Sequence, residues 1–135
     1  MSVPFLDTNI FLRHLLHDHE DHSPRSTAYL ERVERGEFRV QTADTVVFEV
    51  VFTLQSFYRQ PKDTIRDLVL PLIELPGIEL PGKPLFRRAF SYYVDQNLPF
   101  ADAYHAAMME RAGIEEIVSF DRHFDRVGGI QRIEP

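Results

Sequence analysis

Short apolar runs that are typical of strands alternate along this chain with longer segments that are typical of helices. Strands that alternate with helices in this way favour a parallel sheet covered on both faces by helical layers. We therefore expect an α/β fold, a three-layer α/β/α sandwich with a central, mostly parallel sheet of about four to five strands. The expected strands cover residues 3–6, 38–41, 78–80, 117–120 and 130–133.

The segments expected to form helices lie between these strands. They start after residues that favour helix caps, and they end near glycine or proline. Pro71 falls inside one of them, where we expect a kink or a break. The expected helices cover residues 9–16, 23–36, 44–58, 62–75, 84–96 and 100–112, and a short helical turn follows Asp121.

Length and composition are those of an ordinary globular protein. The chain has 135 residues, of which 44% are hydrophobic and 27% charged, which is enough to bury a core. We find no internal repeat and no linker. Residues 1–135 are therefore expected to form a single domain.

Cysteine is absent from the sequence, which excludes disulfides, thiolate zinc sites and cysteine nucleophiles. The N-terminus lacks the basic segment and long apolar stretch of a secretory signal. No run approaches the ~18 apolar residues of a membrane span. We expect a cytoplasmic protein that does not associate with membranes.

The net charge of −6 argues at first against a nucleic-acid partner. A site made of carboxylates would, however, be largely neutralised by bound divalent cations. The basic residues are thirteen arginines and two lysines, and arginine is the better fork for phosphate oxygens. Four arginines are candidates for a basic rim that contacts RNA, although solvated helix faces explain most such residues: Arg87, Arg88, Arg122 and Arg126.

Four carboxylates, Asp7, Glu49, Asp102 and Asp121, lie where apolar segments begin or end. An acid beside apolar neighbours is costly unless it is paired or bound to a cation. Asp7 and Asp121 directly follow expected strands, at the edge where ligands bind in open α/β sheets. Asp102 falls in the first turn of its helix. Together the four residues indicate a pocket for a divalent metal.

Glu49 is placed by a helical wheel. At about 100° per residue, Glu49 lies in a narrow polar stripe beside the apolar face of its helix. That face groups Val46, Val50, Leu54 and Phe57. A lone acid on so apolar a helix faces something polar or marks the boundary with solvent.

Oxygen ligands without cysteine favour Mg²⁺ or Mn²⁺, which can activate a water and neutralise charge on a phosphodiester. Thr8, Asn9 and Ser119 lie beside the strand-end acids, where they are expected to orient a carboxylate or contact a phosphate oxygen. His105, three residues after Asp102, has two interpretations, a supporting contact to that acid or packing in the core.

Each acid taken alone has a simpler explanation. Asp7 and Asp121 are each at a position typical of a helix cap, and Asp102 is a favourable charge in a first helical turn. Glu49 is explained equally well as a boundary residue. Four such coincidences at the right places are less probable than one.

The residues around these acids resemble a known family. The four blocks are DTNIFLR from Asp7, the helical Glu49, LPFADAYHAA from Leu98, and SFDRHF from Ser119. Together, over essentially the whole chain, they resemble the PIN domain, and their order and spacing are most similar to the toxin ribonucleases of bacterial VapBC toxin–antitoxin pairs.

This resemblance implies a single PIN-like domain that acts as a Mg²⁺- or Mn²⁺-dependent endoribonuclease and cleaves RNA phosphodiester bonds with a metal-activated water. It also implies a cognate antitoxin partner and a homodimer. Carried over by position, Asp7 and Asp102 are the primary metal ligands, and Glu49 and Asp121 complete the acidic quartet. The alternatives are a PIN nuclease that is not a toxin, or a non-catalytic PIN scaffold that binds RNA or protein.

The sequence departs from the family pattern near its end. Ser119 stands where many members have threonine, which preserves a hydroxyl. His123 stands where many have a second aspartate. Any fifth carboxylate must therefore come from Asp125.

Two other site classes fit less well. An aspartyl phosphatase would carry a second aspartate two residues after Asp7, where this chain has Asn9, and it would need a catalytic lysine. A transition-metal site is suggested by four histidines close in sequence, although nothing in the sequence orders them. They are His14, His17, His19 and His22.

Overall fold

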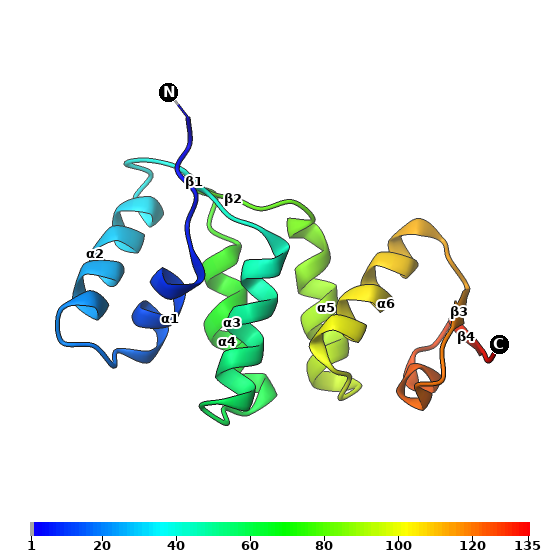
Figure 1. The fold of residues 1–135 in the computed structure, drawn as a ribbon. Coiled ribbons are helices and arrows are strands. Elements are labelled where there is room, and N and C mark those ends of the chain that lie inside the picture. Colours follow the sequence, from blue (N-terminus) through cyan, green and yellow to red (C-terminus); the bar gives the residue numbers. More distant parts are fainter. Residues whose placement is uncertain (1) are drawn as a thin grey trace. The chain divides into compact units, whose positions relative to one another are not determined.

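The computed structural model describes residues 2–135 as helices joined by short strands and loops (Figure 1). The chain divides into two compact units, unit 1 (Met1–Lys83) and unit 2 (Pro84–Pro135). Each unit contains helices and one small parallel sheet.

The strands of unit 1 are β1 (Val40–Gln41) and β2 (Ile78–Glu79), which pair in parallel. The first expected strand, 3–6, is present as an extended segment that forms a single parallel bridge, Phe5 to Gln41. Backbone hydrogen bonds hold it there, with Leu6 N–H donating to Gln41 at 2.7 Å. The segment that ends at Asp7 is therefore fixed beside β1.

Four helices complete unit 1. They are α1 (Thr8–Leu16), α2 (His22–Glu34), α3 (Asp44–Ser56) and α4 (Lys62–Ile73). The helix is not broken at Pro71: α4 continues through it and ends two residues later. Pro71 has no N–H to donate to the carbonyl of Asp67, so α4 lacks one hydrogen bond there.

The apolar face of α3 is largely as predicted. Val46, Val50 and Leu54 are buried, but Phe57 is 81% exposed. Phe57 keeps helical backbone angles, and its N–H bonds to the Thr53 carbonyl, so the residue stays on the predicted face. Its predicted burial was wrong because, at the C-cap, it lies beyond the part of that face that other residues cover. Glu49 is exposed at the edge of this face.

Unit 2 contains α5 (Lys83–Asp95), which begins at the last residue of unit 1, and α6 (Phe100–Ala112). Their buried faces are aromatic, with the rings of Phe90 and Phe100 4.8 Å apart. Burial raises the pKa of Tyr93, in the same cluster, to about 12. Gly113 closes α6 with a left-handed φ of 71°, as its position in the sequence predicts.

The sheet of unit 2 joins β3 (Glu116–Val118) in parallel to β4 (Gln131–Ile133). The short helix η1 (Arg122–Arg126) lies between them in sequence. Its position matches the helical turn predicted after Asp121. The chain thus reaches Asp121 from a strand and leaves it through a helical turn.

The described residues therefore form two separate two-stranded parallel sheets, and the predicted central sheet of about four to five strands is not confirmed. The expected order of helices and strands is confirmed. The strands are shorter than the apolar runs that predicted them because only part of each run makes ladder hydrogen bonds. Within residues 2–135, no helix has the length and apolar character needed to cross a bilayer.

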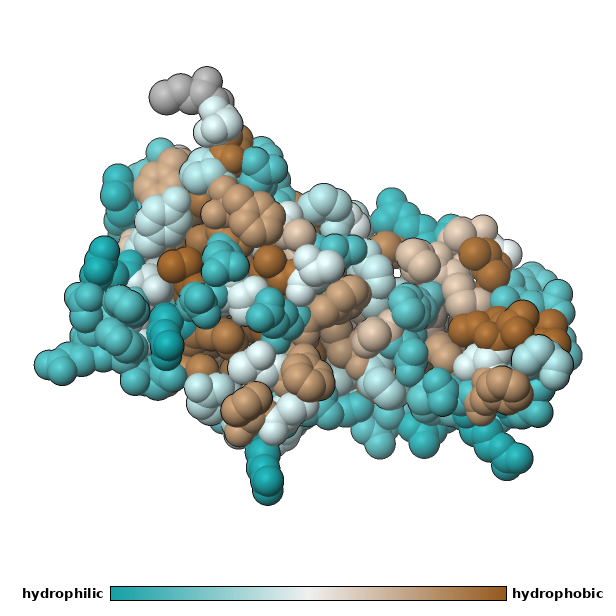
Figure 2. All heavy atoms as spheres, in the orientation of Figure 1, coloured by the Kyte–Doolittle hydropathy of each residue, from teal (hydrophilic) through white to brown (hydrophobic). Residues whose placement is uncertain are grey.

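Apolar side chains reach the surface in both units (Figure 2). The most exposed are Phe57 and Phe52 in unit 1, at 81% and 65%, and Phe120 and Val118 in unit 2, at 70% and 68%.

Candidate metal centre

Asp7 lies between the extended segment at 3–6 and α1, at the N-cap position of that helix. Its backbone is extended, with φ −84° and ψ 160°, but its side chain makes no capping hydrogen bond. The carboxylate is exposed. The explanation of Asp7 as a side-chain cap is therefore not supported by the geometry, and its carboxylate is available to bind a ligand.

Glu49 is held by the residue that follows Asp7. The buried hydroxyl of Thr8 donates a hydrogen bond of 2.9 Å to Glu49 Oε2. This contact spans 41 positions of the sequence and joins the start of α1 to the middle of α3. It places the Glu49 carboxylate beside the chain segment that carries Asp7.

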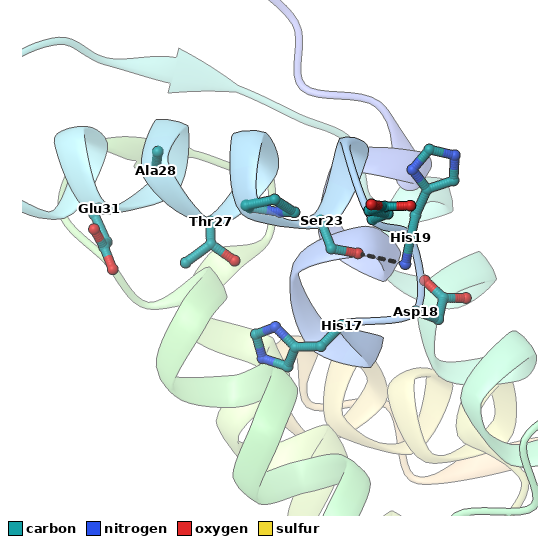
Figure 3. Close-up of a pocket in the computed structure, with 9 residues that line it drawn as sticks. His17, Asp18, His19, Ser23, Thr27, Ala28 and Glu31 are labelled. Atoms are coloured by element: carbon teal, nitrogen blue, oxygen red, sulfur yellow. Dashed lines mark hydrogen bonds between the residues drawn. The ribbon is translucent and has the colours of Figure 1, made fainter.

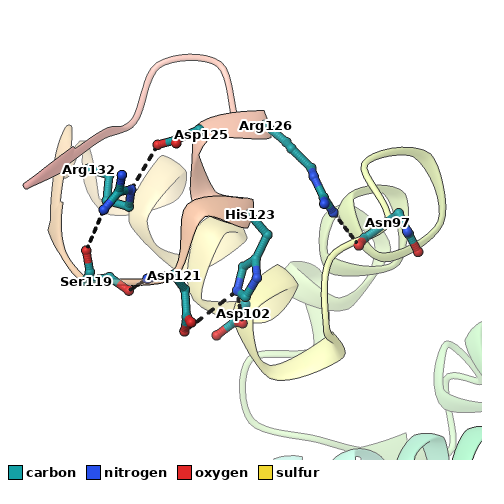
Figure 4. Close-up of polar contacts among 8 residues, drawn as sticks. All are labelled: Asn97, Asp102, Ser119, Asp121, His123, Asp125, Arg126 and Arg132. Carbon is teal, nitrogen blue, oxygen red and sulfur yellow. Dashed lines mark hydrogen bonds and ion pairs between the residues drawn. The ribbon is translucent and has the colours of Figure 1, made fainter.

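In unit 2, Asp102 and Asp121 meet around the imidazole of His123 (Figure 4). Asp102 lies half-buried in the first turn of α6, and Asp121 is the N-cap residue of η1 without a side-chain cap hydrogen bond. His123 Nε2 lies 2.6 Å from Asp102 Oδ2 and 3.8 Å from Asp121 Oδ2.

These three side chains offer ligand atoms that all lie within 4.8 Å of one another. In the part of the chain that the structure describes, they are the one group of three or more potential metal ligands this close together. Two carboxylates and an imidazole suit a divalent cation. We call Asp102, Asp121 and His123 the three-donor group.

Sequence reasoning noted His123 only as a departure from the family pattern. The spacing of two residues from Asp121, across the start of a helical turn, was the available signal. His105 is exposed on α6, which rules out packing in the core as one of its two interpretations, and its supporting contact to Asp102 stays a prediction. The imidazole beside Asp102 is that of His123.

Ser119 and Asp125 have distinct roles around this group. The hydroxyl of Ser119 accepts a hydrogen bond of 3.0 Å from the backbone N–H of Asp121 and so fixes the chain at that acid. Asp125 instead accepts a hydrogen bond of 3.0 Å from Arg132, which also donates to the Ser119 carbonyl. Asp125 is not part of the three-donor group.

Arg88 and Arg126, two of the four arginines predicted to form the basic rim, make contacts within unit 2. Arg88 pairs with Glu110 at 3.1 Å and lies over the Tyr92 ring. Hydrogen bonds from Tyr92 and then Arg88 lower the pKa of Glu110. Arg126 donates to the backbone carbonyl of Asn97 at 2.9 Å (Figure 4). Arg87 and Arg122 are exposed.

A hollow of about 670 Å³ opens beside Asp7, between α1 and α2. Asn9, Arg13, Arg25 and Tyr29 are among the residues that line it. Arg13 is paired with Asp18 at 3.1 Å and Arg25 with Asp21 at 3.2 Å, both on the exposed surface. The sequence analysis did not single out Arg13 or Arg25, because only the packing of α1 on α2 brings them to Asp7.

The four clustered histidines make other contacts. His14 Nδ1 lies 2.8 Å from the Thr27 hydroxyl, and burial lowers the pKa of His14. His19 Nδ1 accepts a hydrogen bond of 2.8 Å from the His22 backbone N–H, and these two rings are stacked. His17 and His19 line a separate hollow (Figure 3). Within residues 2–135 they form no group of three close ligands.

Comparison with known proteins shows the family of the chain. The family model described as PIN domain matches residues 5–130, which covers both units. The chain is also similar to a protein named VapC ribonuclease from Aquifex aeolicus (strain VF5), with 29% identity over 128 residues that cover 93% of each chain. The match over nearly the whole length shows that this chain belongs to the PIN domain family.

Proposed function

We propose that this protein is an endoribonuclease that depends on Mg²⁺ or Mn²⁺, and that Asp7, Glu49, Asp102 and Asp121 serve the same reaction. The observation that carries the proposal is the three-donor group, in which Asp121 and Asp102 converge and no lysine or arginine of the described residues pairs with either of them. The similarity to a protein named as a ribonuclease supports it.

The donor set fits a hard divalent cation. Carboxylate oxygens are the ligands that Mg²⁺ and Mn²⁺ prefer. None of the four acids is paired with arginine or lysine among residues 2–135. Asp7 and Asp121 stand at helix N-caps without capping, so their oxygens are uncommitted there.

We propose that Asp102 and Asp121 hold the cation in unit 2 and that Asp7 and Glu49 contribute the acids of unit 1. A divalent cation, when bound, supplies activation of a water and neutralisation of charge on the phosphodiester. The Thr8 hydroxyl orients Glu49, and the Ser119 hydroxyl fixes the backbone of Asp121.

The hollow beside Asp7 supports RNA as the substrate. Arg13 and Arg25 can exchange their exposed ion pairs for phosphate oxygens at little cost, because exposed pairs contribute only about 0–1 kcal/mol. The Tyr29 ring in the same hollow suits an unstacked base. Exposed Arg122, next to Asp121, is the corresponding rim residue of unit 2. Such local sites permit RNA binding despite the net charge of −6.

We also propose that the protein is the toxin of a VapBC-type pair, acts in the cytoplasm as a single PIN-like domain, and binds a cognate antitoxin and a second copy of itself. The name of the similar VapC protein supports the toxin assignment, and the family match across both units supports the single domain. The exposed Phe52 and Phe57 provide apolar surface for a protein partner. The three-layer sandwich with one central sheet stays a prediction.

The proposal is tested with the purified protein and a mixed pool of labelled cellular RNA. We expect cleavage with Mg²⁺ or Mn²⁺, none with EDTA, and recovery when metal is restored. Cleavage that persists in EDTA would contradict metal dependence. Binding without cleavage under every metal condition would instead indicate the non-catalytic scaffold.

The toxin assignment has its own test. Expression of the protein without an antitoxin is expected to arrest bacterial growth, and expression of Asp121→Asn is not. Growth that is indifferent to expression of an active nuclease would contradict the toxin role and indicate a PIN nuclease with another task.

A further inference from the structure

His123 occupies the centre of the three-donor group, although the family pattern has an aspartate at its position in many members. Its imidazole is half-buried, 22% exposed, and Nε2 lies 2.6 Å from Asp102 and 3.8 Å from Asp121. No other side chain in the described residues brings a nitrogen ligand within 4.8 Å of these two acids.

The three ligand atoms are close enough to reach one cation after small side-chain movements. Ligand atoms on neighbouring positions of an octahedral ion lie about 3.0 Å apart when each bond is about 2.1 Å, and atoms on opposite positions lie about 4.2 Å apart. The separation from Asp121 falls between these values. The separation from Asp102 needs to open by a few tenths of an ångström, which a half-buried side chain at a helical turn can accommodate.

Binding of a cation to Nε2 neither adds a proton to the imidazole nor removes one from it. With Asp102 ionised, the hydrogen bond requires a proton on Nε2 of the imidazole. When Nε2 donates its lone pair to a cation, the neutral ring carries its proton on Nδ1 instead. The cation thereby takes the place of the shared proton between Asp102 and His123.

Replacing a carboxylate ligand by an imidazole changes which cation is preferred. Mg²⁺ favours oxygen ligands and retains water, whereas imidazole nitrogen binds transition metals well. An imidazole also brings no negative charge. A group with His123 is therefore poorer for Mg²⁺ than a group with a third carboxylate.

We infer that His123 supplies a nitrogen ligand to the cation held by Asp102 and Asp121, and that it shifts the preference of this protein from Mg²⁺ toward Mn²⁺. The inference rests on the proposed metal-dependent function and adds a ligand that the acidic quartet does not contain. A purely structural His123, which only holds Asp102 in place, is the alternative that the experiment must separate.

Electron spin echo measurements on the full-length protein with less than one equivalent of Mn²⁺ separate the two roles, because a directly bound imidazole nitrogen modulates the echo decay. We expect ¹⁴N modulation in the wild type and its loss in His123→Asn. The matched control is His105→Asn, an exposed histidine on the same helix as Asp102, which is expected to keep the modulation.

Calorimetric titrations with Mn²⁺ and Mg²⁺ give the second measurement. His123→Asn is expected to weaken Mn²⁺ binding on the order of tenfold and Mg²⁺ binding much less. His123→Asp, which restores the carboxylate, is expected to lower the Mn²⁺-to-Mg²⁺ affinity ratio on the order of tenfold. Circular dichroism of each variant establishes that it is folded.

The outcomes are distinct. A wild type that binds Mn²⁺ and cleaves RNA without ¹⁴N modulation overturns the role of His123 and leaves the proposed function standing. Modulation that persists in His123→Asn, or an unchanged affinity ratio in both folded variants, overturns it as well. A wild type that binds neither cation overturns the inference and the metal-dependent function together.

Discussion

In unit 1 the carboxylate of Glu49 receives its hydrogen bond from the hydroxyl of Thr8, whereas in unit 2 the carboxylate of Asp102 is bonded to the imidazole of His123. The hydroxyl is neutral, orients the acid and leaves its charge unchanged. The imidazole can itself bind a metal. A carboxylate is thus positioned in one unit by a group that only orients it, and in the other by a group that can itself bind the cation.

The exposure of the site residues to solvent also differs between the two units. Asp7 and Glu49 are both exposed, while in unit 2 Asp102 and His123 are half-buried and Asp121 alone is exposed. Electrostatic interactions strengthen as water is excluded. We therefore expect unit 2 to determine which cation binds, and unit 1 to add negative charge and, through the hollow beside Asp7, the contacts to RNA.

The largest effect is expected from Asp121→Asn. Removal of one anionic oxygen from the three-donor group should lower RNA cleavage by at least about 100-fold, because the amide keeps the shape but not the charge. Cleavage rates at fixed Mn²⁺ concentration provide the measurement.

Asp125→Asn is the matched control for that variant. Asp125 lies in the same helical turn and is exposed, but its carboxylate is directed to Arg132. We expect a change of less than about threefold, as is usual for surface substitutions. Equal losses in the two variants would show that Asp125 belongs to the site and that the three-donor group is drawn too narrowly.

A smaller effect is expected from Thr8→Val, which keeps the branched shape and removes the hydroxyl that orients Glu49. Loss of such a supporting contact typically reduces activity about tenfold. Thr45→Val, an exposed threonine on the same helix as Glu49, is the control and should retain wild-type cleavage. If Thr8→Val also retained it, the supporting role of the hydroxyl would be wrong.

The smallest effect is expected in the pH dependence of stability, where His14 is compared with His22. His14, in unit 1, has a hydroxyl partner, and burial followed by nearby His17 lowers its pKa from 6.5. A lowered pKa means that the unfolded chain takes up the proton first, so this term lowers the free energy of unfolding as the pH falls below about 6.5.

Urea denaturation at a series of pH values measures how much the protonation of His14 lowers the free energy of unfolding. His14→Gln should remove part of the loss of stability between about pH 7 and pH 5.5, while His22→Gln, at an exposed histidine, should leave the loss unchanged. An identical pH dependence in His14→Gln and the wild type would contradict the assignment.

Much of the fold followed from sequence signals that act locally. The helix at 100–112 was predicted with its observed ends because Pro99 precedes it and Gly113 follows it. The burial of Phe57 was wrongly predicted because a helical wheel gives the direction of a side chain but not how far along the helix that face is covered. The sheet prediction was less secure because pairing between strands depends on contacts distant in sequence, and the two described sheets have strands of only two or three residues.

The site was predictable to a similar degree. Asp102 and Asp121 could be named from their positions at a helix start and a strand end, and the structure brings them together. The places of His123 and Arg25 at the site could not be predicted from the sequence. The direction of the His123 ring depends on the turn of η1, and the place of Arg25 depends on how α2 packs against α1.

The most direct test of the central claim compares one acid from each unit. RNA cleavage at saturating Mn²⁺ is measured for the wild type, Asp7→Asn and Asp102→Asn, with circular dichroism to establish that each is folded. If the acids of both units serve one metal-dependent reaction, each substitution should reduce cleavage by at least about 100-fold. Full cleavage by either folded variant would contradict the account.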